Sequence, residues 1–412
     1  VLLAPAVALA QSTSISSLSP DVAAAIVLFV AASALLSLLS DPQTTEGGLQ
    51  FGLLLITTLL AVAVTFKSTV TVFAALAWPL AILAAYRVSR SSASRRPIEK
   101  TVLAALALSL ALGVSWVGNG LVTTGYPAYP SDLWGIPADW RVPEEQAQAE
   151  LAWIGHWARN YFGPEARNFI PYGARLTWEW RWLAPWLASL ILHVQALWTI
   201  VLPLLLVALS VSAYLRQRRR SRGDVDRPAG RGWWLLLPTT LGLVFWFLVA
   251  PRPLFGLPLF WILAATVGAH VVDSLARRRA WTGRRMVTMA IVVAALPLLV
   301  TPFPGLLRGA GTGLTPTWNP LLEMPAGHVL EPAPQVAVGR FTTDSGLLLY
   351  VPADNRCWDA PLPCTPHPAS NLTLRRPGNL ASGFRVEGGW LAQRYPSRHS
   401  TFLSLWRQYV GD

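Results

Sequence analysis

Eight long apolar runs, separated by polar segments, dominate this chain of 412 residues. A helix needs roughly 20 apolar residues to cross a hydrocarbon core of about 30 Å, and most of the runs approach that length. In chain order they cover residues 21–39, 49–66, 69–86, 101–118, 183–215, 233–250, 257–275 and 286–300. The pattern predicts an all-α polytopic membrane bundle of about eight transmembrane helices. The fifth run is long enough to tilt or to begin above the membrane.

Two segments outside these runs divide the chain further. Residues 1–119 are expected to hold four spans, residues 120–182 a long loop, residues 183–301 four more spans, and residues 302–412 a separate domain. The first ten residues read either as the end of a secretory signal or as the stub of an earlier helix. We favour the stub.

The long loop is rich in proline and tryptophan, and its second part has helical spacing. Four prolines between Pro127 and Pro143 exclude one continuous helix through the loop, because each fixes φ and removes an amide donor. After Pro143, apolar side chains at Leu151, Ile154 and Ala158 predict an amphipathic helix. Its tryptophans are typical of a segment that rests at a membrane surface.

The C-terminal domain is predicted to be small and rich in β-structure. Residues 335–352 read as two strands around a turn, and residues 371–389 as a second pair with Pro-Gly and Ser-Gly breakers. Cys357 and Cys364, the two cysteines of the chain, lie between these pairs. Their proximity predicts a disulfide in an oxidising compartment, and a metal site with His367 is the alternative.

Basic residues determine the expected orientation. The net charge is +12, yet 17 of the 33 lysines and arginines fall in three short segments, at 87–100, 216–231 and 277–285. Each segment lies between two apolar runs, where the positive-inside rule places cytoplasmic loops, so the charge gives no reason to expect nucleic acid as a partner. Alternation of the spans then places Lys67, the 120–182 loop and the C-terminal domain outside.

No motif of a soluble enzyme is present, and the candidate site residues are polar side chains on the outer face. The sequence lacks a P-loop, GxGxxG after a strand, HExxH and GxSxG. Arg141 and Arg159 can clamp a phosphate or pair with acids of their own loop. Asp21 and Asp139 are candidate substrate-binding carboxylates, and both also occupy positions typical of backbone caps.

Lys67 is the most informative of these residues. It stands with one serine between two apolar runs, and so caps the tip of an antiparallel helical hairpin. An ammonium group held at the membrane boundary suits a phosphate or carboxylate of a lipid-linked substrate. The alternative is an interfacial anchor whose charge reaches the lipid headgroups.

Several motifs together resemble those of an uncharacterised family of large bacterial multi-pass proteins related to the GT-C glycosyltransferases. They are SPD before the first run, VTFKSTV at the hairpin, TGYPAYPSDLWGIPADWRVPEE with WIGHWAR in the loop, and DNRCWDAPLPCTP with the later SGF. The resemblance implies a polyprenyl-phosphate sugar donor and transfer at the extracytoplasmic face. The usual catalytic Asp of the first outer loop is not found in this chain, and Lys67 matches the lysine near the GT-C cavity.

The leading hypothesis is therefore a GT-C-like membrane glycosyltransferase, or the C-terminal part of one, in the bacterial inner membrane. Its expected partners are membrane lipids, a lipid-linked sugar and other membrane subunits. No cofactor is expected, although the loop carboxylates could bind a divalent metal. The alternative is a non-catalytic subunit that helps to organise a larger membrane complex. A transporter is less well supported, because no run carries the buried ionisable residues of a coupling site.

Overall fold

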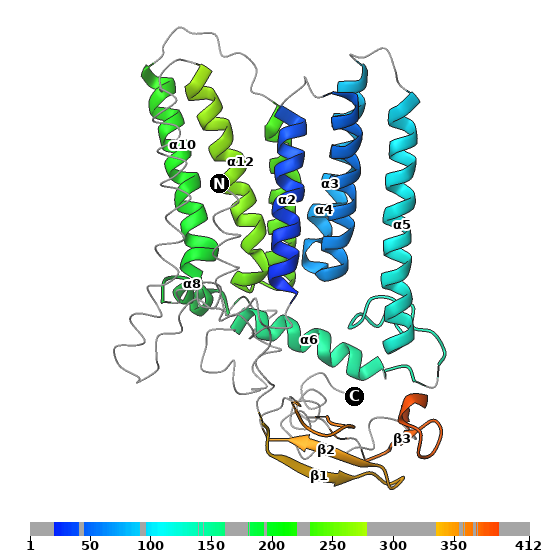
Figure 1. The fold of residues 1–412 in the computed structure, drawn as a ribbon. Helices are drawn as coiled ribbons and strands as arrows, with labels where there is room; N and C mark the ends of the chain where they lie inside the picture. Colours follow the sequence, from blue (N-terminus) through cyan, green and yellow to red (C-terminus); the bar gives the residue numbers. More distant parts are fainter. Residues whose placement is uncertain are drawn as a thin grey trace, which may run out of the picture. The chain divides into compact units, whose positions relative to one another are not determined.

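Seven helices that are long and apolar enough to cross a membrane occur in the described part of the computed structural model (Figure 1). The structure describes residues 20–40, 45–90, 96–138, 140–142, 144–160, 180, 182–192, 196–220, 231–277, 335–353, 357, 359–365, 368 and 370–386. The chain divides into two units, residues 1–114 with 184–322 and residues 115–183 with 323–412. The predicted eighth span and the helix stub at residues 1–10 lie outside the described residues.

The first four predicted spans are confirmed as helices. They are α2 (Asp21–Ser40), α3 (Glu46–Phe66), α4 (Thr71–Arg90) and α5 (Arg96–Thr124). A short 3-10 turn, η2 (Ser68–Val70), joins α3 to α4, and Lys67 is the one residue between α3 and this turn. The tight hairpin expected around Lys67 is therefore present. The helix α5 is longer at both ends than the apolar run that predicted it.

The fifth predicted run, which was expected either to tilt or to begin above the membrane, contains several helical elements in the described residues. The structure has a short helix α8 (Leu183–Leu192), a π-helical turn η4 (Leu197–Val201) and then α10 (Leu202–Arg220). The spanning part is confined to Leu197–Arg216. Pro203 explains the wide turn, because proline cannot donate to the carbonyl four residues earlier and its ring clashes with that carbonyl. Uniform hydrophobicity across 183–215 concealed this change.

The remaining two spans of the described chain are α11 and α12. The 3-10 turn η5 (Arg231–Leu235) leads into α11 (Leu236–Val249), and α12 covers Pro253–Arg277. Together α2 and α12 are the most enclosed of the spans. Small side chains on α2, among them Ala24, Ala25 and Ala32, are buried and allow its close packing against α3.

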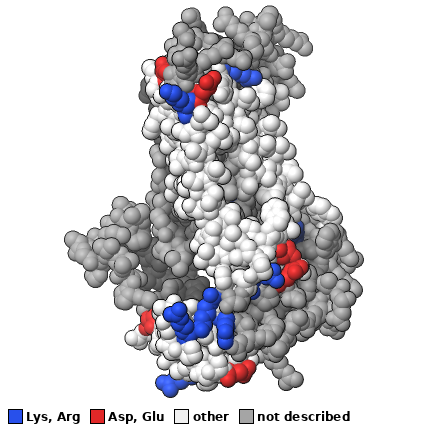
Figure 2. Space-filling view, turned by 90° about the vertical axis from the view of Figure 1, so that its right-hand side faces the viewer, with Lys and Arg blue, Asp and Glu red and all other residues white. Residues whose placement is uncertain are grey.

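Charged side chains gather at one end of the first unit on the face that Figure 2 shows. The broad middle of that face is white, so its described residues are not lysine, arginine, aspartate or glutamate. Leu103, Leu106 and Leu110 of α5 contribute exposed apolar surface. Such a surface is typical of helices whose solvent is lipid rather than water.

The second unit contains α6 (Glu144–Asn160) and two small antiparallel sheets. The predicted amphipathic helix after Pro143 is confirmed as α6. The sheets pair β1 (Val338–Thr342) with β2 (Leu348–Pro352) and β3 (Leu372–Leu374) with β4 (Phe384–Val386), as the turn residues predicted. Cys357 and Cys364 form the predicted disulfide, which leaves neither thiol for a metal.

Gly242 is a close-packing point in the first unit. A Cβ atom added there would lie 3.2 Å from the Cβ of Phe73 on α4 and 3.2 Å from Cδ1 of Leu259 on α12. We expect Gly242→Val to lower the thermal stability of the purified protein in detergent, at a cost of about 1–3 kcal/mol for overpacking. The matched control is Gly52→Val on α3, because an added Cβ there has no heavy atom within 4 Å. Equal melting temperatures for the two variants would contradict this packing.

Candidate functional site

Lys67 is fixed by the backbone on both sides. Its amide donates to the carbonyl of Ala63 at 2.9 Å and ends α3, and its own carbonyl accepts from Val70 at 3.3 Å. The residue is extended, with φ −153° and ψ 116°. The direction of the Lys67 side chain is therefore set by the end of α3 before it and by the start of η2 after it.

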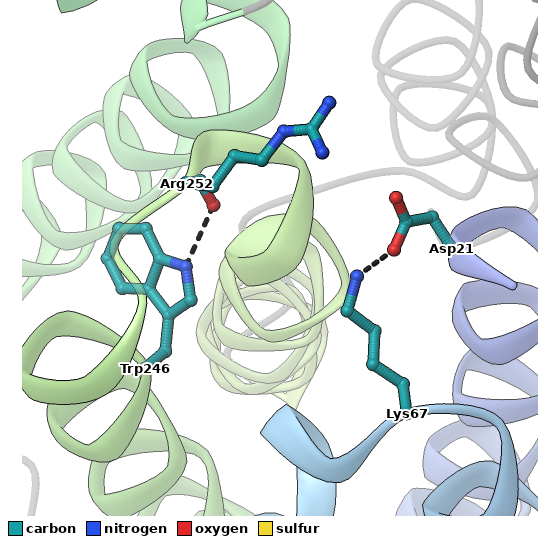
Figure 3. A network of polar contacts seen from close by, with 4 residues as sticks. All are labelled: Asp21, Lys67, Trp246 and Arg252. Carbon is teal, nitrogen blue, oxygen red and sulfur yellow. Dashed lines mark hydrogen bonds and ion pairs between the residues drawn. The ribbon is translucent and has the colours of Figure 1, made fainter. Parts of the chain in front are cut away.

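The Lys67 ammonium forms an ion pair with Asp21, the first residue of α2. Figure 3 shows the two side chains pointing toward one another across the ends of α3 and α2. Only 11% of the Lys67 side chain and 5% of the Asp21 side chain are exposed. The structure thus brings together two of the five residues that the sequence put forward as substrate-binding.

A second cation, Arg252, lies beside this pair. The Lys67 Nζ atom is 3.5 Å from the centroid of the Phe255 ring, and the guanidinium carbon of Arg252 is 5.1 Å from the same centroid. Both distances are in the range of cation–π contacts. Phe255 belongs to the first turn of α12, so the ends of α2, α3 and α12 meet here. We call Asp21, Lys67, Arg252 and Phe255 the Lys67 cluster.

Two indole groups hold the segment that carries Arg252. The Nε1–H of Trp246 donates to the Arg252 carbonyl at 2.9 Å (Figure 3). The Nε1–H of Trp186 donates to the Pro251 carbonyl at 2.8 Å. A Cβ on Gly256 would lie 2.7 Å from the Trp246 ring, so only glycine lets this indole lie against α12. The short connection between α11 and α12 is consequently rigid.

Lys67, Arg252 and Asp21 together bring two positive charges and one negative charge to the Lys67 cluster. Burial lowers the pKa of the Lys67 ammonium, and the positive charge of Arg252 lowers it further. The Asp21 carboxylate acts in the opposite direction, because a neighbouring negative charge favours the protonated form. A negative charge near both cations would relieve their mutual repulsion. The cluster is therefore chemically suited to a phosphate group.

The other predicted site residues belong to the second unit. Arg159 on α6 donates from Nη1 to the Gly155 carbonyl at 2.9 Å and lies 5.5 Å from the Trp182 ring centroid, and burial lowers its pKa. The Arg141 side chain covers Gly125, whose φ is +80°. Asp139 lies outside the described residues. The structure therefore gives Arg141 and Arg159 contacts within their own unit.

Polar contacts also tie the proline-rich loop to α6. The Tyr129 hydroxyl donates to Oε2 of Glu150 at 3.1 Å, and burial together with the Glu150 charge raises the pKa of Tyr129. Gln148 donates from Nε2 to Asp132 at 2.7 Å and to Glu144 at 3.1 Å. The loop acids therefore make structural contacts. In the part of the chain that the structure describes, no three His, Cys, Asp or Glu side chains gather as a metal site.

Arg252 is the functional candidate that sequence reasoning missed. A signal for it existed, because Arg252 is the one charged residue in the short 251–256 turn, which span alternation placed on the same side as Lys67. The criterion that selected Lys67, a lone cation in a tight turn between two apolar runs, would also have selected Arg252.

The fold and the site define a class of protein, a polytopic and mostly helical one with apolar helices of membrane length and a small C-terminal β-region. A family model described as a domain of unknown function, DUF8201, matches residues 1–261. The chain therefore belongs to this family. The match includes all four residues of the Lys67 cluster. No curated protein and no solved structure matches the chain.

The ion pair itself can be tested by a double-mutant cycle. We expect Lys67→Met alone to destabilise the protein by about 3–5 kcal/mol, because it leaves the buried Asp21 carboxylate without its counter-charge. Asp21→Asn alone should also destabilise it. The double variant should lose less stability than the sum of the two, measured by denaturation in detergent. Strict additivity would show that the two charges do not stabilise one another.

Proposed function

We propose that this protein crosses the bacterial inner membrane several times and acts as a GT-C-like glycosyltransferase. In this proposal the Lys67 cluster binds the phosphate of a polyprenyl-phosphate-linked sugar at the extracytoplasmic face. The observation that carries it is the convergence of two cations, Lys67 and Arg252, on Phe255 at one end of a bundle of membrane-length helices. Buried cations in such a position mark an anion or substrate pathway.

The arginine-rich helix ends support the placement of the Lys67 cluster at the extracytoplasmic face. Helix α4 begins just after Lys67 and ends at Arg90, while α12 begins just after Arg252 and ends at Arg277. Helix α10 also ends in basic residues, Arg218 to Arg220. The Lys67 cluster and the basic ends are thus at opposite ends of the same helices. The positive-inside rule then assigns the basic ends to the cytoplasm and the Lys67 cluster to the outside.

The charge change of the reaction explains why two cations are useful. A sugar linked to polyprenyl phosphate is a phosphodiester with one negative charge. As the acceptor hydroxyl bonds to the anomeric carbon, the bond from that carbon to the phosphate oxygen breaks, and the leaving phosphate monoester gains a second negative charge. Lys67 and Arg252 would stabilise this developing charge. Asp21, once the phosphate competes for Lys67, is available to take the proton of the acceptor hydroxyl.

A non-catalytic subunit is the second candidate, and the Asp21–Lys67 pair favours it. The pair is almost fully buried and joins the ends of two helices. A scaffold that organises partner proteins needs such a fixed helix arrangement. It does not need Lys67 to leave Asp21 and bind another anion. The two candidates differ in what happens to Lys67 when a lipid phosphate is offered.

A transfer assay with the purified protein, a polyprenyl-phosphate sugar and a membrane fraction as acceptor tests the enzymatic proposal. We expect Arg252→Gln to lower kcat about 10²–10³-fold, which is the usual cost of removing one group that stabilises developing charge. We expect Lys67→Gln to cause a similar loss. The matched control is Arg87→Gln, because Arg87 also lies over an aromatic ring, Trp234 at 5.7 Å, but near the other end of α4.

Unchanged turnover of both variants, with Arg87→Gln equally active, would remove the Lys67 cluster from the reaction. If the wild type transfers no sugar and binds no polyprenyl phosphate, the structural candidate is favoured. A melting temperature measured for each variant separates loss of activity from loss of folding.

The proposed orientation has an independent test. A phosphatase reporter that is active only outside the cytoplasm, fused after Asp412, should be active in bacterial cells, because the charge rule places the C-terminal domain outside. The same reporter fused after Arg220, at the end of α10, should be inactive. The reverse pattern would invert the bundle and would place the Lys67 cluster in the cytoplasm.

A further inference from the structure

The tip of the proline-rich loop exposes two large apolar side chains. Trp134 is 83% exposed and Leu133 is 61% exposed, although they are neighbours in a loop with a folded interior. Tyr126, by contrast, is only 2% exposed and forms the centre of that interior. We call Leu133 and Trp134 the loop tip.

The backbone holds the loop tip in this exposed position. Trp134 has φ +58°, a left-handed conformation that is unfavourable for a residue other than glycine. On one side of the tip the Leu133 amide donates to the Ser131 hydroxyl at 3.4 Å. On the other side a Cβ on Gly135 would lie 2.5 Å from the Tyr126 ring, so the backbone packs directly on that ring. The loop backbone therefore adopts an unfavourable conformation that leaves the Trp134 indole exposed.

Hydrogen bonds connect the loop directly to the end of α5. The Ile136 amide donates to the Gly125 carbonyl at 2.9 Å, and the Val142 amide donates to the Thr124 carbonyl at 2.9 Å. The Trp140 indole donates to the Leu121 carbonyl, in the last turn of α5, at 3.4 Å. These contacts anchor both ends of the segment that carries the loop tip. The depth of the loop tip relative to a membrane therefore depends on the depth of the C-terminal end of α5.

The length of α5 places that end in the headgroup layer. The span covers Ile98–Thr124, and its charged residues Glu99 and Lys100 occur in the first turn. At 1.5 Å per residue, about 20 residues from Thr101 cross the hydrocarbon core of about 30 Å. The last turn of α5 then extends about 6 Å further, which matches the thickness of the adjoining headgroup region. The loop tip is anchored at this level.

We infer that the loop tip is a membrane-interface anchor, in which Trp134 and Leu133 insert into the headgroup region of the outer leaflet. Tryptophan is enriched at this depth, because its ring is apolar and its N–H can still bond to water or headgroups. The occupant is lipid, since exposed apolar surface continues along α5 itself, where Val122 in the last turn is 72% exposed. A rigid anchor of this kind would fix the loop above the membrane. The inference rests on the proposed membrane insertion and orientation and not on the proposed sugar transfer.

Site-specific fluorescence can test this contact in the full-length protein. Both native cysteines are joined in the disulfide, so Trp134→Cys or Leu133→Cys provides the single free thiol. Each variant is labelled with an environment-sensitive NBD group and placed in phosphatidylcholine–phosphatidylglycerol nanodiscs. Val122→Cys is the lipid reference, and Asp344→Cys, in the exposed turn between β1 and β2, is the water reference.

We expect labels at 133 and 134 to be quenched by shallow nitroxide lipids at least half as strongly as the label at 122. Their quenching by iodide should be several-fold weaker than that of the label at 344. Strong iodide quenching without lipid quenching would overturn the inference, and protection from both quenchers would overturn it in favour of a protein partner. If the label at 122 also lacks lipid quenching, membrane insertion of α5 fails as well. Lipid quenching at 122 but not at 133 and 134 contradicts only the anchor.

Discussion

The buried contact between Asp21 and Lys67 is the constraint on which the candidate site depends. It joins the first residue of α2 to the residue that ends α3, and it places an ammonium group against the ring that begins α12. Charges so enclosed are costly unless they are paired, so the pair has to form whenever the three helix ends meet. The close packing of the alanine-rich α2 on α3 brings its two partners within reach.

The surroundings of the pair are built to keep Arg252 beside it. Two indole N–H groups, from Trp186 and Trp246, bond to consecutive carbonyls of the α11–α12 connection. Gly256 leaves room for the second indole. These bonds fix the backbone that carries Arg252, and the ion pair with Asp21 holds the Lys67 ammonium. Pre-organised charge is what electrostatic catalysis requires. The same rigidity would serve a scaffold protein, which is why the response of Lys67 to a lipid phosphate distinguishes the two roles.

The second unit uses glycine and backbone strain for a different purpose. Gly125 and Gly135 allow the Arg141 side chain and the Tyr126 ring to approach the backbone closely, which closes the loop on the end of α5. Trp134 then takes a left-handed conformation and faces away from the loop interior. The loop thus combines a packed base with an apolar tip. These two properties are the ones that the proposed membrane-interface anchor requires.

The sequence by itself determined seven helical spans of the described residues, the Lys67 hairpin, the helix after Pro143, the two strand pairs and the disulfide. Each is specified locally, by the length of an apolar run, by helical or alternating spacing, or by turn residues and cysteines close together. The pairing of Lys67 with Asp21, the approach of Arg252 to Phe255 and the outward Trp134 were decided by the tertiary structure. An apolar side chain has a similar free energy whether it faces lipid or the helix bundle. The apolar runs therefore predict which segments are spanning helices, but not which helix ends contact one another. The π-helical turn before Pro203 was hidden by the same uniformity, because hydrophobicity measures how favourably a segment leaves water and not the path of its backbone.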